Sequence, residues 1–287
     1  MTHAHPHASP HSSRHDTDPD GQAEILDLDA EVLAEHIAAI TAWLPVARAP
    51  REIVDLGCGT GTGTFALLER FPEAHVTAVD MSAEHLRRLR DKACDAGVRD
   101  RVHTVQADLD AADWPDLGTP DLVWASASMH HMHEPGRTLR SVHGLLAPGG
   151  LFAVVELAGF PRFLPENAPE EQPGLEDRCH AASERHHAAH VSHRGADWGP
   201  MLTAAGFAIE GERTITVNIE GSQDPAIGRY ALGSLQRLRH SAVDSLSSGD
   251  LAALDRLLEV DGPQCILRRG DLSVRTERSV WAARRGN

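Results

Sequence analysis

The chain has 287 residues and a formal net charge of −15, which argues against a nucleic-acid or anionic-membrane partner, because phosphate binding needs a basic face that replaces counterions. This length can hold one large domain with insertions, and we expect one domain acting on a small-molecule substrate. No run approaches the roughly 18 to 20 apolar residues of a membrane span, and the N-terminus has no apolar signal core, so we expect a cytoplasmic protein.

The first 20 residues contain almost nothing that could be buried, and prolines interrupt them, so we expect a disordered tail. This tail could bind a transition metal, because neutral imidazole is a good metal ligand. A solvated low-complexity tail is the simpler interpretation, because histidine-rich composition is weak evidence for a site. The histidines concerned are His3, His5, His7, His11 and His15.

Residues 23 to 44 place apolar side chains at helical spacing and end at Pro45, which predicts one or two helices before the first strand. Strands and helices then alternate, which predicts right-handed crossovers and a parallel sheet with helices on both faces. Ligands of such sheets lie beyond the carboxyl ends of the strands. The expected strands are 52–56, 75–79, 101–106, 121–126 and 151–157, and the expected helices are 62–70, 82–96 and 135–147.

After Leu157 the alternation stops at a proline-rich, acidic stretch. We expect helices at 175–191, 198–207, 225–243 and 249–258, a long strand ending near Ile219 and a final strand at 279–285. On the first of these helices, His186 and His190 stand four residues apart and could hold a metal ion with a third ligand from elsewhere. A lid helix with a partly solvated histidine face is the favoured alternative. In the next insert, Tyr230 is a candidate pocket residue.

Residues 53 to 63 read I-V-D-L-G-C-G-T-G-T-G, an apolar strand that ends in glycines and leads into a helix. Glycines let the backbone approach a ligand, and the helix start offers free N–H groups. The dinucleotide fingerprint G-x-G-x-x-G/A fits only the frame Gly61, Gly63 and Ala66, and four residues separate the start of this frame from the expected strand end. The frame that fits the strand end is D-x-G-x-G-x-G, from Asp55 to Gly61.

This second frame resembles the first motif of the class I S-adenosylmethionine-dependent methyltransferases, and the order and spacing of the chain agree with that family from about Ile53 to Leu157. The resemblance implies a Rossmann-like α/β fold with a seven-stranded, mostly parallel sheet. It also implies a C-terminal antiparallel hairpin, here opened by an inserted helical segment. The implied cofactor is S-adenosyl-L-methionine.

The resemblance assigns cofactor contacts to residues at three strand ends. It implies that Asp55 anchors the loop or accepts from the methionyl ammonium, and that Asp80 accepts the two ribose hydroxyls. Asp108 and Leu109 would contact the adenine edge, with Met81 against the adenine face. Asp55 as a loop anchor and Asp108 as a turn former are structural alternatives. The full expected cofactor set is Asp55, Gly57, Gly59, Gly61, Asp80, Met81, Asp108, Leu109 and Ser126.

The fourth strand leads into S-M-H-H-M-H, which resembles the M-H-H segment of many small-molecule methyltransferases. The resemblance places Ser126 beside the cofactor, and His130 and His131 near the methyl-transfer site. Either histidine could accept a proton, because an unperturbed pKa near 6.5 suits neutral pH. The alternatives are a packing role for His131 and the absence of any dedicated base.

We therefore expect a disordered tail at 1–20 and one methyltransferase domain at 21–287. Within it, residues 21–50 are N-terminal helices, 51–157 the cofactor-binding core, and 158–200 and 220–275 lid and substrate inserts. The predicted function is methylation of an O, N or C nucleophile of a small metabolite, without a metal, and the acidic helical inserts could form a homodimer surface. Two other functions stay open: a non-catalytic, metal-linked regulatory protein on this fold, and an NAD-dependent oxidoreductase.

Overall fold

The computed structural model describes residues 19–187, 193–220 and 224–286. The histidine tail and His190 lie outside the described residues, so the metal interpretations of both stay predictions. The helices are α1 Pro19–Val32, α2 Ala34–Trp43, α3 Thr62–Arg70, α4 Ala83–Asp95, α5 Pro135–Leu145, α6 Leu175–His187, α7 Gly199–Ala204, α8 Pro225–Ala242 and α9 Ser248–Leu258. The strands are β1 Glu52–Leu56, β2 His75–Asp80, β3 Val102–Gln106, β4 Leu122–Ser126, β5 Leu151–Leu157, β6 Phe207–Ile219 and β7 Val274–Arg285.

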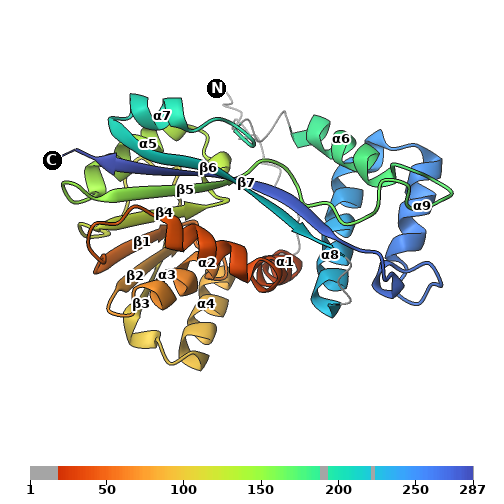
Figure 1. Ribbon diagram of the computed structural model, residues 1–287, viewed down its shortest axis with the longest axis horizontal. Coiled ribbons are helices and arrows are strands. Elements are labelled where there is room, and N and C mark those ends of the chain that lie inside the picture. The colour runs from red at the N-terminus through yellow and green to blue at the C-terminus, as the bar shows by residue number, and fades with distance from the viewer. Residues whose placement is uncertain (1–18, 188–192, 221–223, 287) are drawn as a thin grey trace, which may run out of the picture.

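The seven strands form one sheet in the order β3-β2-β1-β4-β5-β7-β6 (Figure 1). The first five pair in parallel, and β7 pairs antiparallel with both β5 and β6. The order reverses between β1 and β4, which is the switch point where open α/β sheets bind ligands. The expected α/β class and the antiparallel C-terminal hairpin are confirmed.

Alternate side chains of the parallel strands enter two separate cores. Ile53 and Trp124 pack on the side of α2 and α3, whereas Val54 and Val123 pack on the side of α5 and α7. Figure 1 shows these helices as layers on opposite faces of the sheet. A strand buried on both faces requires apolar residues at nearly every position, which explains the continuous apolar runs of the sequence.

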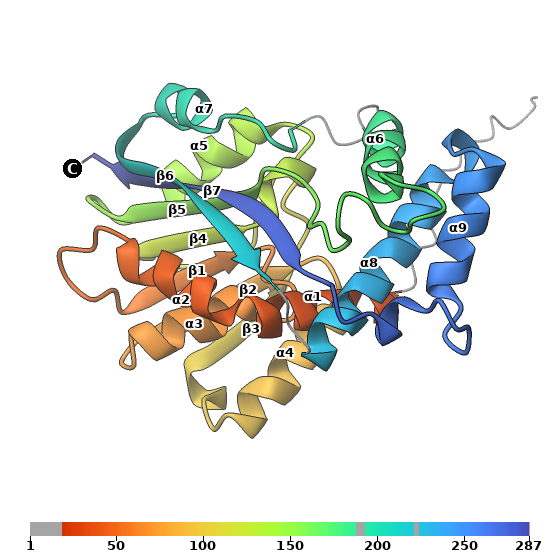
Figure 2. The ribbon, with the colours of Figure 1, turned by 45° about the vertical axis from the view of Figure 1, so that its right-hand side comes forward.

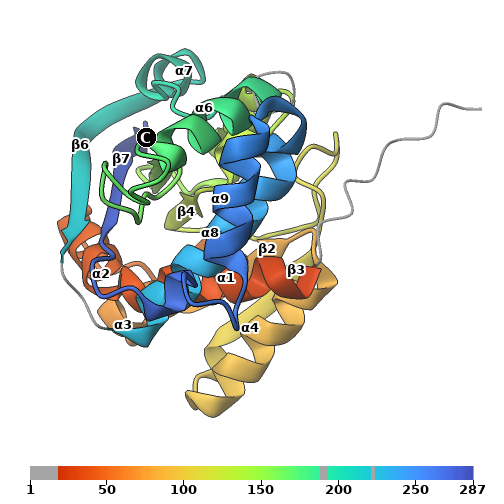
Figure 3. The same ribbon diagram turned by 90° about the vertical axis from the view of Figure 1, so that its right-hand side faces the viewer.

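The second insert, described from Asp224 to Ser273, lies at the carboxyl end of the parallel strands. Leu157 at the end of β5 is opposite Arg278, while β7 begins four residues earlier at Val274, opposite Ile219 of β6. The two long strands therefore extend past the parallel ones. They carry α8 and α9 beyond the sheet edge, where α8 packs against α6 and α1 (Figures 2 and 3).

The structure differs from the sequence-based expectations at several element ends. α1 already begins at Pro19, and β7 begins at Val274, five residues before the expected start. Tyr230 does not line a pocket: it is 3% exposed, packs edge-on against Phe163 at 5.0 Å and donates its hydroxyl to Asp29 at 2.6 Å. Within the described ranges, no helix is long and apolar enough to cross a membrane.

Candidate functional site

The turn after β1 is built from three glycines with positive φ: Gly57 at 68°, Gly59 at 53° and Gly61 at 101°. Gly61 directly precedes α3, so the frame that starts at Gly57 forms the turn. In the alternative frame, Gly63 is already inside the helix. A Cβ on Gly57 would lie 2.4 Å from the Ser128 Cβ, so this position has no room for a side chain.

The loop is tied to the end of β2. The N–H groups of Gly57 and Cys58 both donate to the Val79 carbonyl, at 2.8 and 3.0 Å. The Gly59 N–H donates to the Asp80 Oδ2 at 2.9 Å. These bonds hold the backbone of the loop in place and join the first two predicted acidic positions into one cluster.

Asp55 lies beneath the loop, 2% exposed, and accepts a hydrogen bond from the Thr64 hydroxyl at 2.7 Å. Burial raises its pKa to about 7, although the hydrogen bond from Thr64 opposes the shift. The charge of nearby Asp80 raises it further. Asp55 is thus bonded to the first turn of α3, which is the arrangement expected of a residue that anchors the glycine loop.

Asp80 joins the glycine loop to the start of α4. Its Oδ1 accepts from the Ser82 N–H at 2.8 Å and lies 3.3 Å from the His85 Nδ1. Burial raises the pKa of Asp80, but the His85 side chain and the N–H groups of Ser82 and Gly59 lower it more, so the net pKa is below its usual value. Asp80 is therefore a charged carboxylate at neutral pH, 8% exposed.

The remaining residues of the expected adenine side lie around the ends of β2 and β3. Met81 exposes 71% of its surface, and its carbonyl accepts from Gln106 at 3.0 Å. Asp108 is exposed and accepts from the Asp110 N–H at 2.9 Å, which is the geometry of a turn-forming aspartate. Leu109 is buried.

The segment after β4 begins at Ser126, which is partly exposed, and continues through Ala127 with a φ of 52°. Ser128 follows and donates its hydroxyl to the Leu56 carbonyl at 2.8 Å. This bond links the end of β1 to the segment after β4, directly across the switch point. A short 3-10 helix, Met129–His131, comes next.

His130 is paired with a residue that the sequence analysis missed, Glu156 of β5. The His130 Nδ1 lies 2.5 Å from the Glu156 Oε2, and each residue is 2% exposed. The Glu156 Oε1 accepts from the N–H groups of Met129 at 2.8 Å and His130 at 3.3 Å. An acid near the end of an otherwise apolar strand was the signal available in the sequence.

His131 is exposed, with its ring centroid 4.1 Å from that of His130. His130 and His131, to which the sequence analysis gave the same possible role, therefore differ in burial: His130 is buried and His131 is exposed. A third, His133, is exposed and pairs with Asp110 at 2.8 Å, and this hydrogen bond raises the pKa of His133. His133 with Asp110 ties the segment after β4 to the turn after β3.

Helix α1 covers the glycine loop. Leu26 would lie 3.2 Å from a Cβ on Gly59, and Asp27 pairs with Lys92 of α4 at 2.5 Å. The Lys92 ammonium also donates to the Thr60 carbonyl at 3.2 Å. The only lysine of the chain thus connects α1, α4 and the glycine loop.

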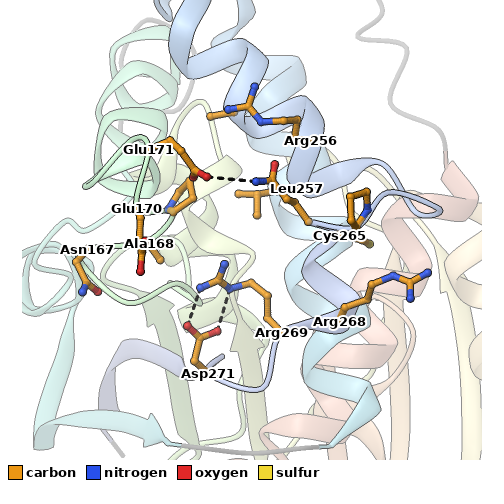
Figure 4. Close-up of a pocket in the computed structure, with 14 residues that line it drawn as sticks. Asn167, Ala168, Glu170, Glu171, Arg256, Leu257, Cys265, Arg268, Arg269 and Asp271 are labelled. Carbon is orange, nitrogen blue, oxygen red and sulfur yellow. Dashed lines mark hydrogen bonds and ion pairs between the residues drawn. The ribbon is translucent and has the colours of Figure 1, made fainter.

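A surface pocket of about 380 Å³ lies elsewhere, between the loop around Glu170 and the segment after α9 (Figure 4). Two of the charged side chains that line it, Arg269 and Asp271, form an ion pair at 2.6 Å. It contains none of the predicted site residues. We therefore assign the candidate site to the carboxyl edge of the sheet and not to this pocket.

Among the described residues, no group of three His, Cys, Asp or Glu side chains could hold a metal.

Known proteins match only a part of this chain in sequence. A family model described as a methyltransferase domain matches residues 53–150, which run from β1 to the turn before β5. A trans-aconitate 2-methyltransferase from Acidovorax sp. (strain JS42) is 41% identical over 106 residues, covering 37% of this chain and 38% of that protein. A malonyl-[acyl-carrier protein] O-methyltransferase from Laribacter hongkongensis is 34% identical over 116 residues, 39% of each chain.

The chain thus spans about two fifths of the length of these curated relatives. Among solved structures, a putative methyltransferase from Bacillus halodurans C-125 superposes with a TM-score of 0.56 at 17% identity, covering 88% of this chain and all of that one. At this identity the likeness concerns the fold. Glu156 and the other residues of the edge that follow residue 150 lie outside the matched segment.

Proposed function

We propose that this protein, whose residues 53–150 form a class I methyltransferase domain, transfers a methyl group from S-adenosylmethionine to a small molecule. The observation that carries the proposal is the bond between Asp80 and the Gly59 N–H, which joins the glycine turn and the acid of the next strand in one site. The similarity to a trans-aconitate 2-methyltransferase from Acidovorax supports a small-molecule acceptor.

The residues at the switch point fit this cofactor. A carboxylate has about four lone-pair positions, and Asp80 uses its own mainly for the Gly59 and Ser82 N–H groups, which leaves capacity for a ribose hydroxyl. The positive-φ glycines would let the backbone approach the methionyl and ribose parts. Met81, Asp108 and Leu109 would serve the adenine, and Ser126 would lie beside the sulfonium.

When bound, S-adenosylmethionine supplies a methyl group already activated on sulfur, so the protein has mainly to position the acceptor and receive its proton. In our proposal His130 receives that proton. Its Nδ1 faces the Glu156 carboxylate, which accepts an Nδ1–H and leaves Nε2 as the basic nitrogen. Glu156 is then a positioning residue that also stabilises the imidazolium once formed. His131, being exposed, would contact the acceptor.

Calorimetry with S-adenosylhomocysteine and, separately, NADH tests the cofactor assignment. We expect binding of S-adenosylhomocysteine in the micromolar range and none of NADH. Binding of NADH alone would return the function to a dinucleotide-dependent oxidoreductase. The cytoplasmic location and the homodimer stay predictions from the sequence.

A further inference from the structure

Arg194 lies at the carboxyl edge of β5, on the segment between α6 and α7. Its neighbour Gly195, with a φ of 70°, would place a Cβ 3.4 Å from the Ala158 carbonyl, just past the end of β5. The negative charge of Glu156 acts on the Arg194 guanidinium and favours its charged form. Arg194 is therefore within electrostatic reach of the His130–Glu156 pair.

The guanidinium of Arg194 lies over an aromatic ring. Its Cζ lies 3.9 Å from the centroid of the Phe160 ring, a cation–π distance. The His180 ring of α6 contacts the same ring with centroids 5.9 Å apart. Burial lowers the pKa of His180 to about 4, so this imidazole is neutral near pH 7 and adds no charge to the stack.

Two donors of this guanidinium have no acceptor. Arg194 Nε and Nη1 are buried and lack a hydrogen-bond partner among the described residues. The Glu156 oxygens accept from His130 and the Met129 N–H, and not from these two donors. A buried charged donor left unpaired is costly, so the site lacks an acceptor that this part of the chain does not supply.

A second arginine adds positive charge at the same place. Arg237 of α8 lowers the pKa of Arg194 through like-charge repulsion, in addition to the larger effect of burial. The groups facing Arg194 are thus one further cation and the carboxylates of Glu156 and Glu184.

We propose that Arg194 binds a carboxylate of the methyl acceptor and thereby sets its position relative to His130. A guanidinium stacked on an aromatic ring offers its donors in one plane, and a planar carboxylate matches that arrangement. A singly charged group also suits a site that already contains Glu156 and Glu184, whereas a doubly charged phosphate would be repelled more strongly. This inference rests on the proposed function for the identity of the reaction.

The test uses the full chain saturated with S-adenosylhomocysteine and a panel of small dicarboxylates, beginning with malonate and succinate, each compared with its diamide by calorimetry at constant ionic strength. We expect at least one acid to bind when its diamide does not. The variant Arg194→Gln should weaken that binding at least 10-fold, and Arg194→Lys, which keeps a charge, should weaken it less. The control Arg185→Gln changes an exposed arginine of α6 and should bind like wild type.

The proposal fails if no acid binds better than its diamide, or if Arg194→Gln binds acids as well as wild type does. The affinity for S-adenosylhomocysteine should be the same in wild type and Arg194→Gln, which also reports that the variant is folded. Repeating the titrations without S-adenosylhomocysteine separates the two hypotheses. Arg194-dependent acid binding by a protein that does not bind S-adenosylhomocysteine would retain the carboxylate site and remove the proposed function.

Discussion

Along the carboxyl edge of the sheet, the half of the site at β1 and β2 is built around a glycine turn whose N–H groups bond to the end of β2, whereas the half at β4 and β5 is built around a buried histidine–carboxylate pair. On the first half, Asp80 accepts from two backbone N–H groups of neighbouring turns. On the second half, Glu156 holds the His130 ring, and Arg194 lies against Phe160.

This difference explains where the resemblance to other proteins ends. A backbone-built cradle requires glycines and acids at fixed spacing, so it leaves a sequence motif, and the family match covers that part, residues 53–150. A side-chain-built half can use different residues for each acceptor. Glu156 and Arg194 lie beyond the matched segment, where specificity would vary.

The largest expected effect lies in the acceptor half. Glu156→Ala removes the acceptor of three buried groups, the Met129 and His130 N–H and the His130 ring, and should lower the free energy of unfolding by about 3 kcal/mol. Urea denaturation measures this loss. Glu156→Gln, which keeps one acceptor oxygen, should lose less, and the exposed Glu73→Ala should change little. A loss below about 1 kcal/mol would mean that side chains do not hold this half together.

The cofactor half is tested by Asp80→Ala. This change removes the acceptor for the Gly59 and Ser82 N–H groups and the carboxylate offered to the ribose, so the affinity for S-adenosylhomocysteine should fall about 100-fold, or about 2.7 kcal/mol. Calorimetry measures it, with the exposed Asp95→Ala of α4 as the matched control. Unchanged affinity in the Asp80 variant would remove the cofactor site from this position.

The anchoring role of Asp55 predicts a pH dependence of stability. Its pKa is about 7 in the folded protein and about 3.9 when unfolded, so the folded state binds more protons between these values and stability contributed by this group falls as pH rises. From pH 5 to pH 7 the loss should be about 2 kcal/mol. Asp55→Asn should lack it, so unfolding of the two proteins is compared across this range. Parallel pH profiles would contradict the assignment.

The smallest expected loss of stability concerns the contact between Gly57 and Ser128, where the two halves of the site meet. Gly57→Ala and Gly97→Ala introduce the same Cβ at similar positive φ, 68° and 66°, but only the first meets another residue, Ser128 at 2.4 Å. Gly57→Ala should therefore cost about 1 to 2 kcal/mol more in thermal or urea unfolding. In a Ser128→Gly background, which lacks both the Ser128 Cβ and its hydrogen bond to Leu56, the two glycine substitutions should cost the same. Equal costs at both positions would show that the halves are not in tight contact there.

The elements of the core could be predicted because their signals are local. Apolar runs that end in glycine or an acid gave β1, β2, β4 and β5 within a residue of the structure, and the spacing of Asp55, Gly57 and Asp80 predicted their cluster. β7 was expected to start five residues too late, because Val274 to Glu277 lie beyond the end of β5 and pair with β6 and, at Arg275, with Arg162, and this pairing is not encoded nearby. Tyr230 was misplaced for the same reason, since its partner Asp29 lies 201 residues away.

The amino-acid sequence by itself determined the fold class, the glycine turn and the order of the acids along the carboxyl edge, because strand periodicity and positive-φ turns depend on neighbours within a few residues. Only the tertiary structure decided which histidine is buried against a carboxylate, where α8 and α9 lie, and which arginine is left without an acceptor. Those outcomes depend on side chains that are tens of residues apart, and burial and charge at such contacts are set by the packing of the whole sheet edge.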